Sequence, residues 1–214
     1  MIGLGLPADR LHLLCIGAHP DDVEIGCGGT LLSIAATRNV TATVVVATGI
    51  GQRHGEALKS TPRFLPGADV DVTILALPDG RLPEHWGHVK EEFERVAAAT
   101  PTPDLVFAPR QEDAHQDHRV VAELVHTAWR DSMILRYEVP KWDGDLGRAS
   151  HYVPLDEDTA RRKVELLDEC FPSQVGRGWW GEETFLALAK LRGIECRSRF
   201  AEAFLVDKAI ITLG

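Results

Sequence analysis

The sequence lacks the features by which membrane, secreted and nucleic-acid-binding proteins are usually identified. No apolar run reaches 18 residues, so we expect no transmembrane helix. The N-terminus has no basic segment followed by an apolar one, which argues against a secretory signal. The net charge is −9 at pH 7, and we therefore expect neither nucleic acid nor an anionic membrane as a partner.

Cysteine is also scarce. The 214 residues include four cysteines, and no two of them have the Cys-x-x-Cys spacing of a redox or metal-binding pair. Cys15 falls in an apolar run and is predicted to be a buried thiol. Cys27 falls among glycines and acidic residues, where it is either a small packing residue or an additional metal ligand. We predict reduced thiols and a cytoplasmic location.

Two nucleotide-binding signatures are missing as well. The first apolar run is not followed by Gly-x-Gly-x-x-Gly, and the chain has no Gly-Lys-Ser/Thr, which disfavours a dinucleotide site and a phosphate-binding P-loop. The chain does have 44% apolar residues, enough for a sizeable core. Its length suits a single domain that spans residues 1–214.

Short β-branched and apolar runs alternate with stretches of helical periodicity. We predict strands at 11–16, 41–47, 70–75, 105–108, 133–139 and 151–153. We predict helices at 30–38, 55–64, 88–99, 120–128, 156–170 and 182–191, the last ended by Gly193. This alternation predicts an α/β fold, a three-layer α/β/α sandwich with a Rossmann-like, mostly parallel sheet.

The stretch from residue 18 to residue 29, Ala-His-Pro-Asp-Asp-Val-Glu-Ile-Gly-Cys-Gly-Gly, follows the first predicted strand. We expect His19, Asp21, Asp22 and Glu24 in the loop at the C-terminal end of that strand, where ligands bind in open α/β sheets. Three carboxylates this close repel one another unless a cation or hydrogen bonds compensate them. A helix cap needs only one such side chain. We therefore predict a divalent-metal site with a spare carboxylate.

A second polar cluster, residues 113–118, follows the strand predicted at 105–108. The C-terminal ends of parallel strands share one edge of a sheet, so the two clusters can converge. His118 would then join His19 and one of the aspartates. Two His and one carboxylate form a catalytic metal set that leaves positions open for water and substrate. The alternative is that His115 and His118 are surface residues at a helix start.

The two motifs resemble a known family. His19-Pro-Asp-Asp22 with the following Val-Glu-Ile-Gly-Cys-Gly-Gly-Thr-Leu, and the later His115-Gln-Asp-His118, resemble the PIG-L/LmbE-like zinc-dependent N-deacetylases. That family includes deacetylases of mycothiol and bacillithiol biosynthesis. The resemblance runs over most of the chain, with weaker landmarks at 77–80, 172–174 and 200–204. It implies a Zn²⁺ cofactor held by His19, Asp22 and His118, with Asp21 as the general base that activates a metal-bound water.

The resemblance also implies the remaining roles. His115 would be the general-acid or electrophilic histidine, with Asp117 as its carboxylate partner. Arg53 and Asp79 match positions that hold sugar hydroxyls. The implied activity is hydrolysis of the N-acetyl amide of a small amino-sugar or sugar conjugate, such as an N-acetylglucosamine derivative.

One position departs from the family pattern. Deacetylases of the mycothiol type carry a Tyr two residues before the first His of the second motif, where this chain has Asp113. The Tyr that polarises the amide carbonyl is therefore missing from that place. The Trp179–Trp180 pair is either core packing or a platform for a sugar ring.

The sequence leaves alternative functions open. The same site suits an amidase that acts on a larger acyl group or a thiol conjugate. Acid-rich loops also suit a metal-dependent phosphoesterase, although two His ligands favour zinc over magnesium. The third alternative is a sugar-binding protein without catalysis, which would have no need of Asp21 as a base. The sequence also leaves the oligomeric state open, and a homo-oligomer is one of the alternatives.

Overall fold

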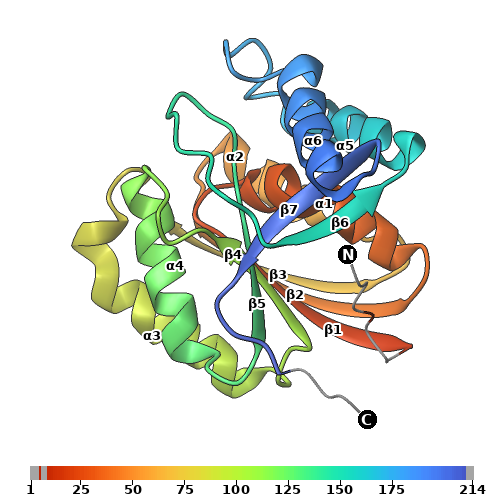
Figure 1. Ribbon diagram of the computed structural model, residues 1–214. Coiled ribbons are helices and arrows are strands. Elements are labelled where there is room, and N and C mark those ends of the chain that lie inside the picture. The colour runs from red at the N-terminus through yellow and green to blue at the C-terminus, as the bar shows by residue number, and fades with distance from the viewer. Residues whose placement is uncertain (1–4, 6–8, 211–214) are drawn as a thin grey trace.

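The computed structural model describes residue 5 and residues 9–210. Most of the N-terminal segment in which we expect no secretory signal lies outside these residues. Figure 1 shows one sheet between two layers of helices. In chain order the elements are β1 (Arg10–Gly17), α1 (Asp22–Ala35), β2 (Asn39–Thr48), α2 (Gln52–Phe64), β3 (Asp69–Leu77), a short 3-10 helix (Leu82–His85), α3 (Trp86–Ala99), β4 (Leu105–Pro109), α4 (Gln116–Ala128), β5 (Met133–Tyr137), β6 (His151–Leu155), α5 (Glu157–Cys170), α6 (Glu182–Cys196) and β7 (Phe200–Val206).

The sheet has the strand order β3-β2-β1-β4-β5-β7-β6. The five strands from β3 to β5 pair in parallel, whereas β7 runs antiparallel to both β5 and β6. The predicted α/β sandwich with a mostly parallel sheet is confirmed. Strand β7 was not predicted, and it is the strand that makes the far edge of the sheet antiparallel.

Alternating side chains of β1 explain the three layers. Leu13 and Cys15 join the core under α1, α2, α5 and α6, while Leu14 and Ile16 join the core under α3 and α4. Because successive residues of a strand point to opposite faces, an apolar run such as this one is buried on both sides. Figure 1 shows α3 and α4 on one face of the sheet and the other four helices on the opposite face.

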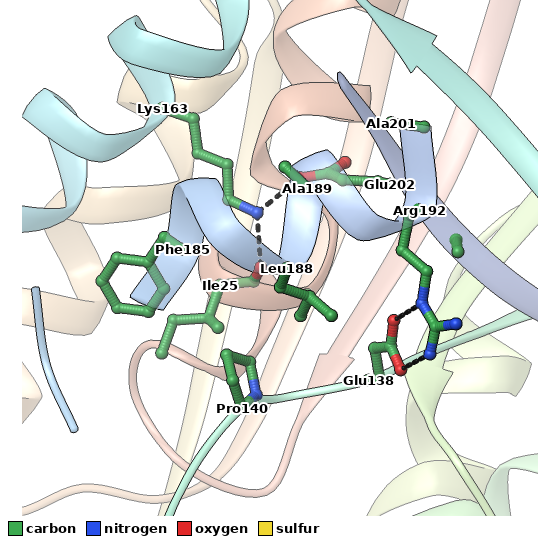
Figure 2. A pocket seen from close by; sticks show the side chains of 12 residues that line it. Ile25, Glu138, Pro140, Lys163, Phe185, Leu188, Ala189, Arg192, Ala201 and Glu202 are labelled. Carbon is green, nitrogen blue, oxygen red and sulfur yellow. Dashed lines mark hydrogen bonds and ion pairs between the residues drawn. The ribbon is translucent and has the colours of Figure 1, made fainter. Parts of the chain in front are cut away.

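A buried ion pair holds the glycine-rich middle of α1 in place. Nζ of Lys163 donates to the carbonyl of Ile25 and to Oε1 of Glu202, both at 2.6 Å (Figure 2). The carboxylate of Glu202 in turn accepts the backbone N–H groups of Gly29 and Thr30, at 2.8 and 2.6 Å. A buried pair that saturates its hydrogen bonds in this way avoids much of the usual desolvation cost. α1 is thereby tied to α5 and β7.

The end of α6 differs from the prediction. Gly193 does not end the helix, which continues to Cys196 and is capped by Arg197 in the left-handed conformation, with φ 64°. A Cβ at Gly193 would lie 2.8 Å from backbone atoms of Arg199. The glycine therefore permits close packing of the following turn and is not a helix terminator. The neighbouring Arg192 forms a bidentate pair with Glu138, also visible in Figure 2.

The remaining predicted elements are present, and their bounds shift by a few residues. The largest shift is in α1, which begins at Asp22, eight residues before the predicted Thr30. Within residues 9–210, no helix has both the length and the apolar character that a bilayer crossing requires. The single domain spanning residues 1–214 stays a prediction.

Candidate active site

The two polar motifs leave adjacent strands of the sheet. β1 pairs with β4, and β2 lies on the other side of β1. After β1 the chain continues to β2 on one side of β1, and it later crosses to β4 on the other side. In open α/β sheets, such a reversal creates a crevice at the C-terminal ends of the strands, where ligands bind. The predicted convergence of the two motifs is confirmed: Nδ1 of His19 lies 3.2 Å from Nε2 of His118.

The first motif forms a tight turn into α1. Asp21 precedes the helix with φ 104°, a conformation that costs free energy in a residue with a Cβ. Asp22 is the first helical residue, and its Oδ2 accepts the backbone N–H of His19 at 2.8 Å. The sequence analysis places Asp22 in the loop, and this is wrong, because Asp22 belongs to α1. The turn points the carboxylates of Asp21 and Asp22 toward different partners.

Glu24 and Cys27 do not join the candidate metal ligands His19, Asp22 and His118. Glu24 lies in α1, not in the preceding loop, and two residues of helix separate it from Asp22 by about 200° around the axis. Its Oε1 accepts the hydroxyls of Ser60 and Thr61, at 2.7 and 2.6 Å. Burial raises the pKa of this carboxyl. Cys27 is buried and its Sγ donates to a backbone carbonyl, which favours the packing role over the ligand role.

Three side chains present their donor atoms to one point. Oδ1 of Asp22 lies 3.3 Å from Nε2 of His118, its other oxygen, Oδ2, lies 3.5 Å from Nδ1 of His19, and the two nitrogens are 3.2 Å apart. Ligands about 2.0–2.1 Å from a tetrahedral zinc ion are about 3.3 Å from one another. The donor types and their spacing therefore fit a zinc ion. Two triplets that contain His19 have one donor atom per residue within 4.8 Å of one another, one with His115 and His118 and one with Asp79 and Asp117, and Asp22 belongs to neither.

Each of these histidines contacts a carboxylate through its other ring nitrogen. Nε2 of His19 lies 3.2 Å from Oδ2 of Asp117, and Nδ1 of His118 lies 2.9 Å from Oδ2 of Asp113. Metal-bound imidazoles usually donate their second N–H to a carboxylate, which fixes the ring and its tautomer. Sequence reasoning missed the role of Asp113. The only available signal was a carboxylate five residues before a candidate ligand.

Charge in this cluster shifts the pKa values of its members. Burial disfavours the charged form of His118, but Asp22 and Asp113 outweigh it and raise the pKa of His118 to about 9. Burial also opposes ionisation of Asp113, yet its hydrogen bond with His118 lowers its pKa to about 2. Asp113 is therefore ionised and acts as an acceptor. Lys141 supports it, with Nζ 3.0 Å from Oδ1.

Asp21 faces Arg53 and not the histidines. Its Oδ2 lies 3.1 Å from a terminal nitrogen of Arg53, which also donates to the carbonyl of Pro20. Burial raises the pKa of Asp21 to about 7, against the opposing effect of the Arg53 charge. A carboxylate with a raised pKa in a cavity is a candidate general base.

The predicted pairing of Asp117 with His115 is wrong. The carboxylate of Asp117 contacts His19 and accepts the backbone N–H groups of Gly80 and Leu82, at 2.7 and 3.0 Å. Only the backbone N–H of Asp117 reaches His115, where it donates to Nδ1 at 3.2 Å. Nδ1 is an acceptor, so Nε2 carries the proton of the neutral ring. Burial and the charges of His19 and His118 lower the pKa of His115, and they outweigh the charge of Asp117, which raises that pKa as expected.

The cluster opens into a cavity of about 180 Å³. Asp21, Arg53, Asp79 and His115 all line it, so the structure brings the predicted catalytic and substrate-binding residues to one place. Asp79 is 73% exposed, and its Oδ1 lies 3.0 Å from Nε2 of His19.

The two adjacent tryptophans have different environments. Trp180 is buried against Phe171 and Phe185, and its indole N–H donates to Asp168 at 2.8 Å. Trp180 is therefore a core residue, as expected of most aromatic pairs. Trp179 lines the cavity, which is the position that the role of a ring platform requires.

Several known proteins are similar to this chain. The family model of PIG-L, GlcNAc-PI de-N-acetylase, matches residues 14–129, which include both motifs. The uncharacterised deacetylase YaiS of Escherichia coli K12 is 32% identical over 143 residues, which is 61% of this chain and 75% of YaiS.

Two solved structures share the fold. The conserved protein TT1542 from Thermus thermophilus superposes with a TM-score of 0.73 at 24% identity, over 95% of this chain and 97% of TT1542. The N,N′-diacetylchitobiose deacetylase of Pyrococcus horikoshii superposes with a TM-score of 0.68 at 20% identity, over 91% and 83% of the two chains. The family model covers more than half of this chain and the match to YaiS extends over three quarters of that protein, so the chain belongs to the PIG-L family of deacetylases, enzymes that hydrolyse amides.

Proposed function

We propose that the protein is a zinc-dependent N-deacetylase that hydrolyses the N-acetyl amide of a small amino-sugar or sugar conjugate. The observation that carries the proposal is the convergence of His19 and His118, whose facing nitrogens are 3.2 Å apart, with Asp22, which has one carboxylate oxygen 3.3 Å from His118 and the other 3.5 Å from His19. Asp21 lies beside them and pairs with Arg53. A divalent-metal site and a nearby base are what metal-dependent amide hydrolysis uses.

His19, Asp22 and His118 are the residues that would hold the ion. Asp22 is preferred to His115 as the third ligand because its carboxylate is buried and its two oxygens lie 3.5 Å from Nδ1 of His19 and 3.3 Å from Nε2 of His118. Two imidazoles and a carboxylate favour zinc over magnesium. Zinc supplies Lewis acidity, which polarises a carbonyl and lowers the pKa of water to about 7.

Asp21 would accept the proton of the water that attacks the amide carbonyl. Its carboxylate is buried and paired with Arg53, and among the described residues it has no ion pair with His19 or His118, so it is available to act as the base. Arg53 holds this carboxylate in one orientation through its hydrogen bond with the Pro20 carbonyl.

His115 would stabilise the oxyanion or protonate the leaving amine. Because its Nδ1 accepts a backbone N–H, the N–H at Nε2 is the group that can donate to substrate. A neutral donor suffices for hydrogen bonding to an oxyanion. The family resemblance implies that Asp117 is the partner of His115, but we infer that Asp117 orients His19 instead.

Arg53 and Asp79 would hold sugar hydroxyls. Both line the cavity, one with a guanidinium donor fork and the other with an exposed carboxylate. Membership in the deacetylase family favours amide hydrolysis, so a phosphoesterase activity is not proposed. Substrate tests distinguish the proposed N-deacetylase from an amidase that acts on a larger acyl group. The cytoplasmic location stays a prediction from the cysteine pattern.

Metal analysis combined with acetate release tests the proposal. We expect about one zinc per chain, little zinc in His118→Ala, and full zinc in His126→Ala, which changes an exposed histidine later on the same helix. Acetate release should be found with N-acetylglucosamine derivatives and should fall in Arg53→Ala and Asp79→Ala. Full zinc in His118→Ala would refute the ligand set. Turnover of N-acetyl amino acids but of no amino-sugar would refute the substrate class.

A further inference from the structure

A small cavity lies between the C-terminal end of β4, strands β5 and β7, and the loop of residues 138–150, which connects β5 to β6. It shares no lining residue with the cavity of the candidate active site. Three of its lining residues are arginines, Arg110, Arg136 and Arg148, and one is acidic, Glu138. Its walls therefore carry more positive than negative charge.

Arg110, the first residue after β4, is buried without a compensating negative charge. Only 8% of its surface is exposed. Its Nη1 donates to the backbone carbonyl of Asp145 at 2.7 Å, and its Nε has no hydrogen-bond partner. Within residues 9–210, no carboxylate forms an ion pair with it. A buried charge is unfavourable unless an opposite charge and hydrogen bonds replace the water that it loses.

The acidic residues around the cavity already have other partners. Glu138 accepts two hydrogen bonds from Arg192, at 2.6 and 2.7 Å (Figure 2). Asp145, whose carbonyl accepts from Arg110, pairs through its carboxylate with Lys141 at 3.0 Å. Neither carboxylate is left to compensate Arg110.

The other two arginines differ in how their charges are matched. Arg136 is 1% exposed, and its Nε lies 2.7 Å from Oδ2 of Asp207. Arg148 is exposed, and among the described residues it has no ion-pair partner. The cavity therefore has a second unmatched guanidinium on its solvent side, in addition to the buried one of Arg110.

Gly147 leaves the space that the guanidinium of Arg110 occupies. A Cβ at Gly147 would lie 2.6 Å from Nη2 and 2.8 Å from Cζ of Arg110. A larger residue at this position would push the guanidinium away from the backbone of the loop. The glycine thus allows the charged group to stay at the cavity, although no acidic side chain meets it there.

The size of the cavity limits what can supply the missing negative charge. Its volume is about 10 Å³, and a single water needs about 10–15 Å³ on the same measure. A carboxylate, phosphate or sulfate group has several heavy atoms and does not fit. A halide ion is only slightly larger than a water molecule, and the exposed Arg148 side chain can change its rotamer to admit it. A water molecule would fit as well, but it brings no charge.

We propose that this cavity binds a chloride ion on the guanidinium of Arg110, with Arg148 closing its solvent side. The ion would compensate the buried charge and would hold the loop of residues 138–150 to the end of β4. The proposal concerns a site apart from the candidate active site and does not depend on the proposed deacetylase function.

Thermal unfolding of the zinc-loaded chain tests the proposal. A ligand that binds only the folded state stabilises it in proportion to the logarithm of its concentration. When chloride replaces methanesulfonate, which is too large for the cavity, at constant ionic strength, Tm should rise by about 3–5 °C for each tenfold increase in chloride above its Kd. Arg110→Met should lose this rise. Gly147→Ala keeps Arg110 but displaces its guanidinium, and should lose most of it.

Arg130→Met is the matched control, because it removes an exposed arginine that does not line the cavity, and it should keep the full rise. Equal Tm values of wild type in the two salts overturn the proposal. A rise of the same size in Arg110→Met also overturns it, since the ion would then bind elsewhere, for example to zinc.

Crystals soaked in sodium bromide give a direct readout that does not depend on stability. We expect an anomalous peak in contact with the guanidinium of Arg110 in wild type and no such peak in Arg110→Met. A cavity without a bromide peak in wild type overturns the anion site and leaves a water molecule as its occupant.

Discussion

Oδ2 of Asp113 lies 2.9 Å from Nδ1 of His118, at the sequence position where mycothiol-type deacetylases have a Tyr. The ionised carboxylate accepts a hydrogen bond from the Nδ1–H of His118, so Nε2 is directed toward Asp22 and His19. Asp113 also accepts the backbone N–H of His115 at 2.8 Å. One carboxylate therefore sets the positions of a candidate metal ligand and of the next candidate catalytic residue.

Replacing Asp113 should weaken zinc binding without removing any ligand. We expect Asp113→Ala to lower zinc affinity by about 10–100-fold, as is typical when the hydrogen-bond partner of a ligand histidine is lost. Asp113→Asn should fall between wild type and Ala, because an amide oxygen can still accept the Nδ1 proton. Competition with a chromogenic chelator measures these affinities. Glu112→Ala removes a neighbouring exposed carboxylate and serves as the control. Equal affinity of Asp113→Ala and Glu112→Ala would contradict the role of Asp113.

Asp21→Asn should separate metal binding from turnover. The amide cannot accept a proton, so we expect kcat to fall by about 10²–10⁴-fold. Zinc content should stay at the wild-type level, because Asp21 contacts Arg53 and not the candidate ligands. Metal analysis and acetate release on the same preparation provide both values. A near-native rate at full zinc occupancy would show that another residue is the base. Glu24 is a poor candidate, since Ser60 and Thr61 occupy its carboxylate.

His115→Ala should affect the chemical step more than substrate binding. The donor at Nε2 gains strength only as negative charge develops on the oxygen or the leaving nitrogen. We therefore expect a loss of about 10²–10³-fold in kcat, with KM changed much less. The variant should also lose one limb of the pH–rate profile. His88→Ala, which changes an exposed histidine in α3, is the control. An unchanged bell-shaped profile in His115→Ala would argue against the assignment.

The start of α5 offers a test of stability that does not involve the active site. Oδ1 of Asp156 accepts the backbone N–H of Thr159 at 2.7 Å and caps the helix. We expect Asp156→Ala to lower the free energy of unfolding by about 1 kcal/mol. The same hydrogen bond lowers the pKa of Asp156 below its ordinary value of 3.8.

The pH dependence of this cap has a definite sign. A carboxyl with a lowered pKa in the folded state stabilises the protein at pH values above 3.8, and this contribution disappears as the pH falls through the folded-state value. Urea unfolding at pH 7 and near pH 3 should therefore show a smaller difference between wild type and Asp156→Ala at the lower pH. Asp156→Asn keeps an acceptor oxygen without the titrating charge, so its stability relative to Asp156→Ala should depend less on pH.

The sheet and the meeting of the two motifs could be predicted because both depend on local patterns. The β-branched runs identify the strands, and parallel strands direct their C-terminal loops to one edge. The partner of Asp117 could not be predicted, because its orientation depends on the turn after β3, where Gly80 and Leu82 donate to it. No local pattern specifies which turn a carboxylate will meet 35 residues away.

Two further differences arise from buried polar contacts. Glu202 interrupts the apolar residues of β7, so the sequence pattern does not predict a strand there. In the structure Lys163 and two backbone N–H groups bind the carboxylate of Glu202. Gly193 lies where the sequence predicts the end of a helix, but in the structure it allows the backbone of Arg199 to pack closely against α6. In both cases the deciding partner comes from another element.

The pairing of β1 with β4 also has a consequence during synthesis of the chain. His19 and His118 are 99 residues apart, and at about 5–20 residues per second the ribosome needs about 5–20 s to add that interval. During that time β1 and β2 can emerge while the second half of the metal-binding cluster does not yet exist. A nascent chain therefore carries the acidic turn but only part of the proposed ligand set, and on this proposal metal capture awaits the docking of β4 beside β1.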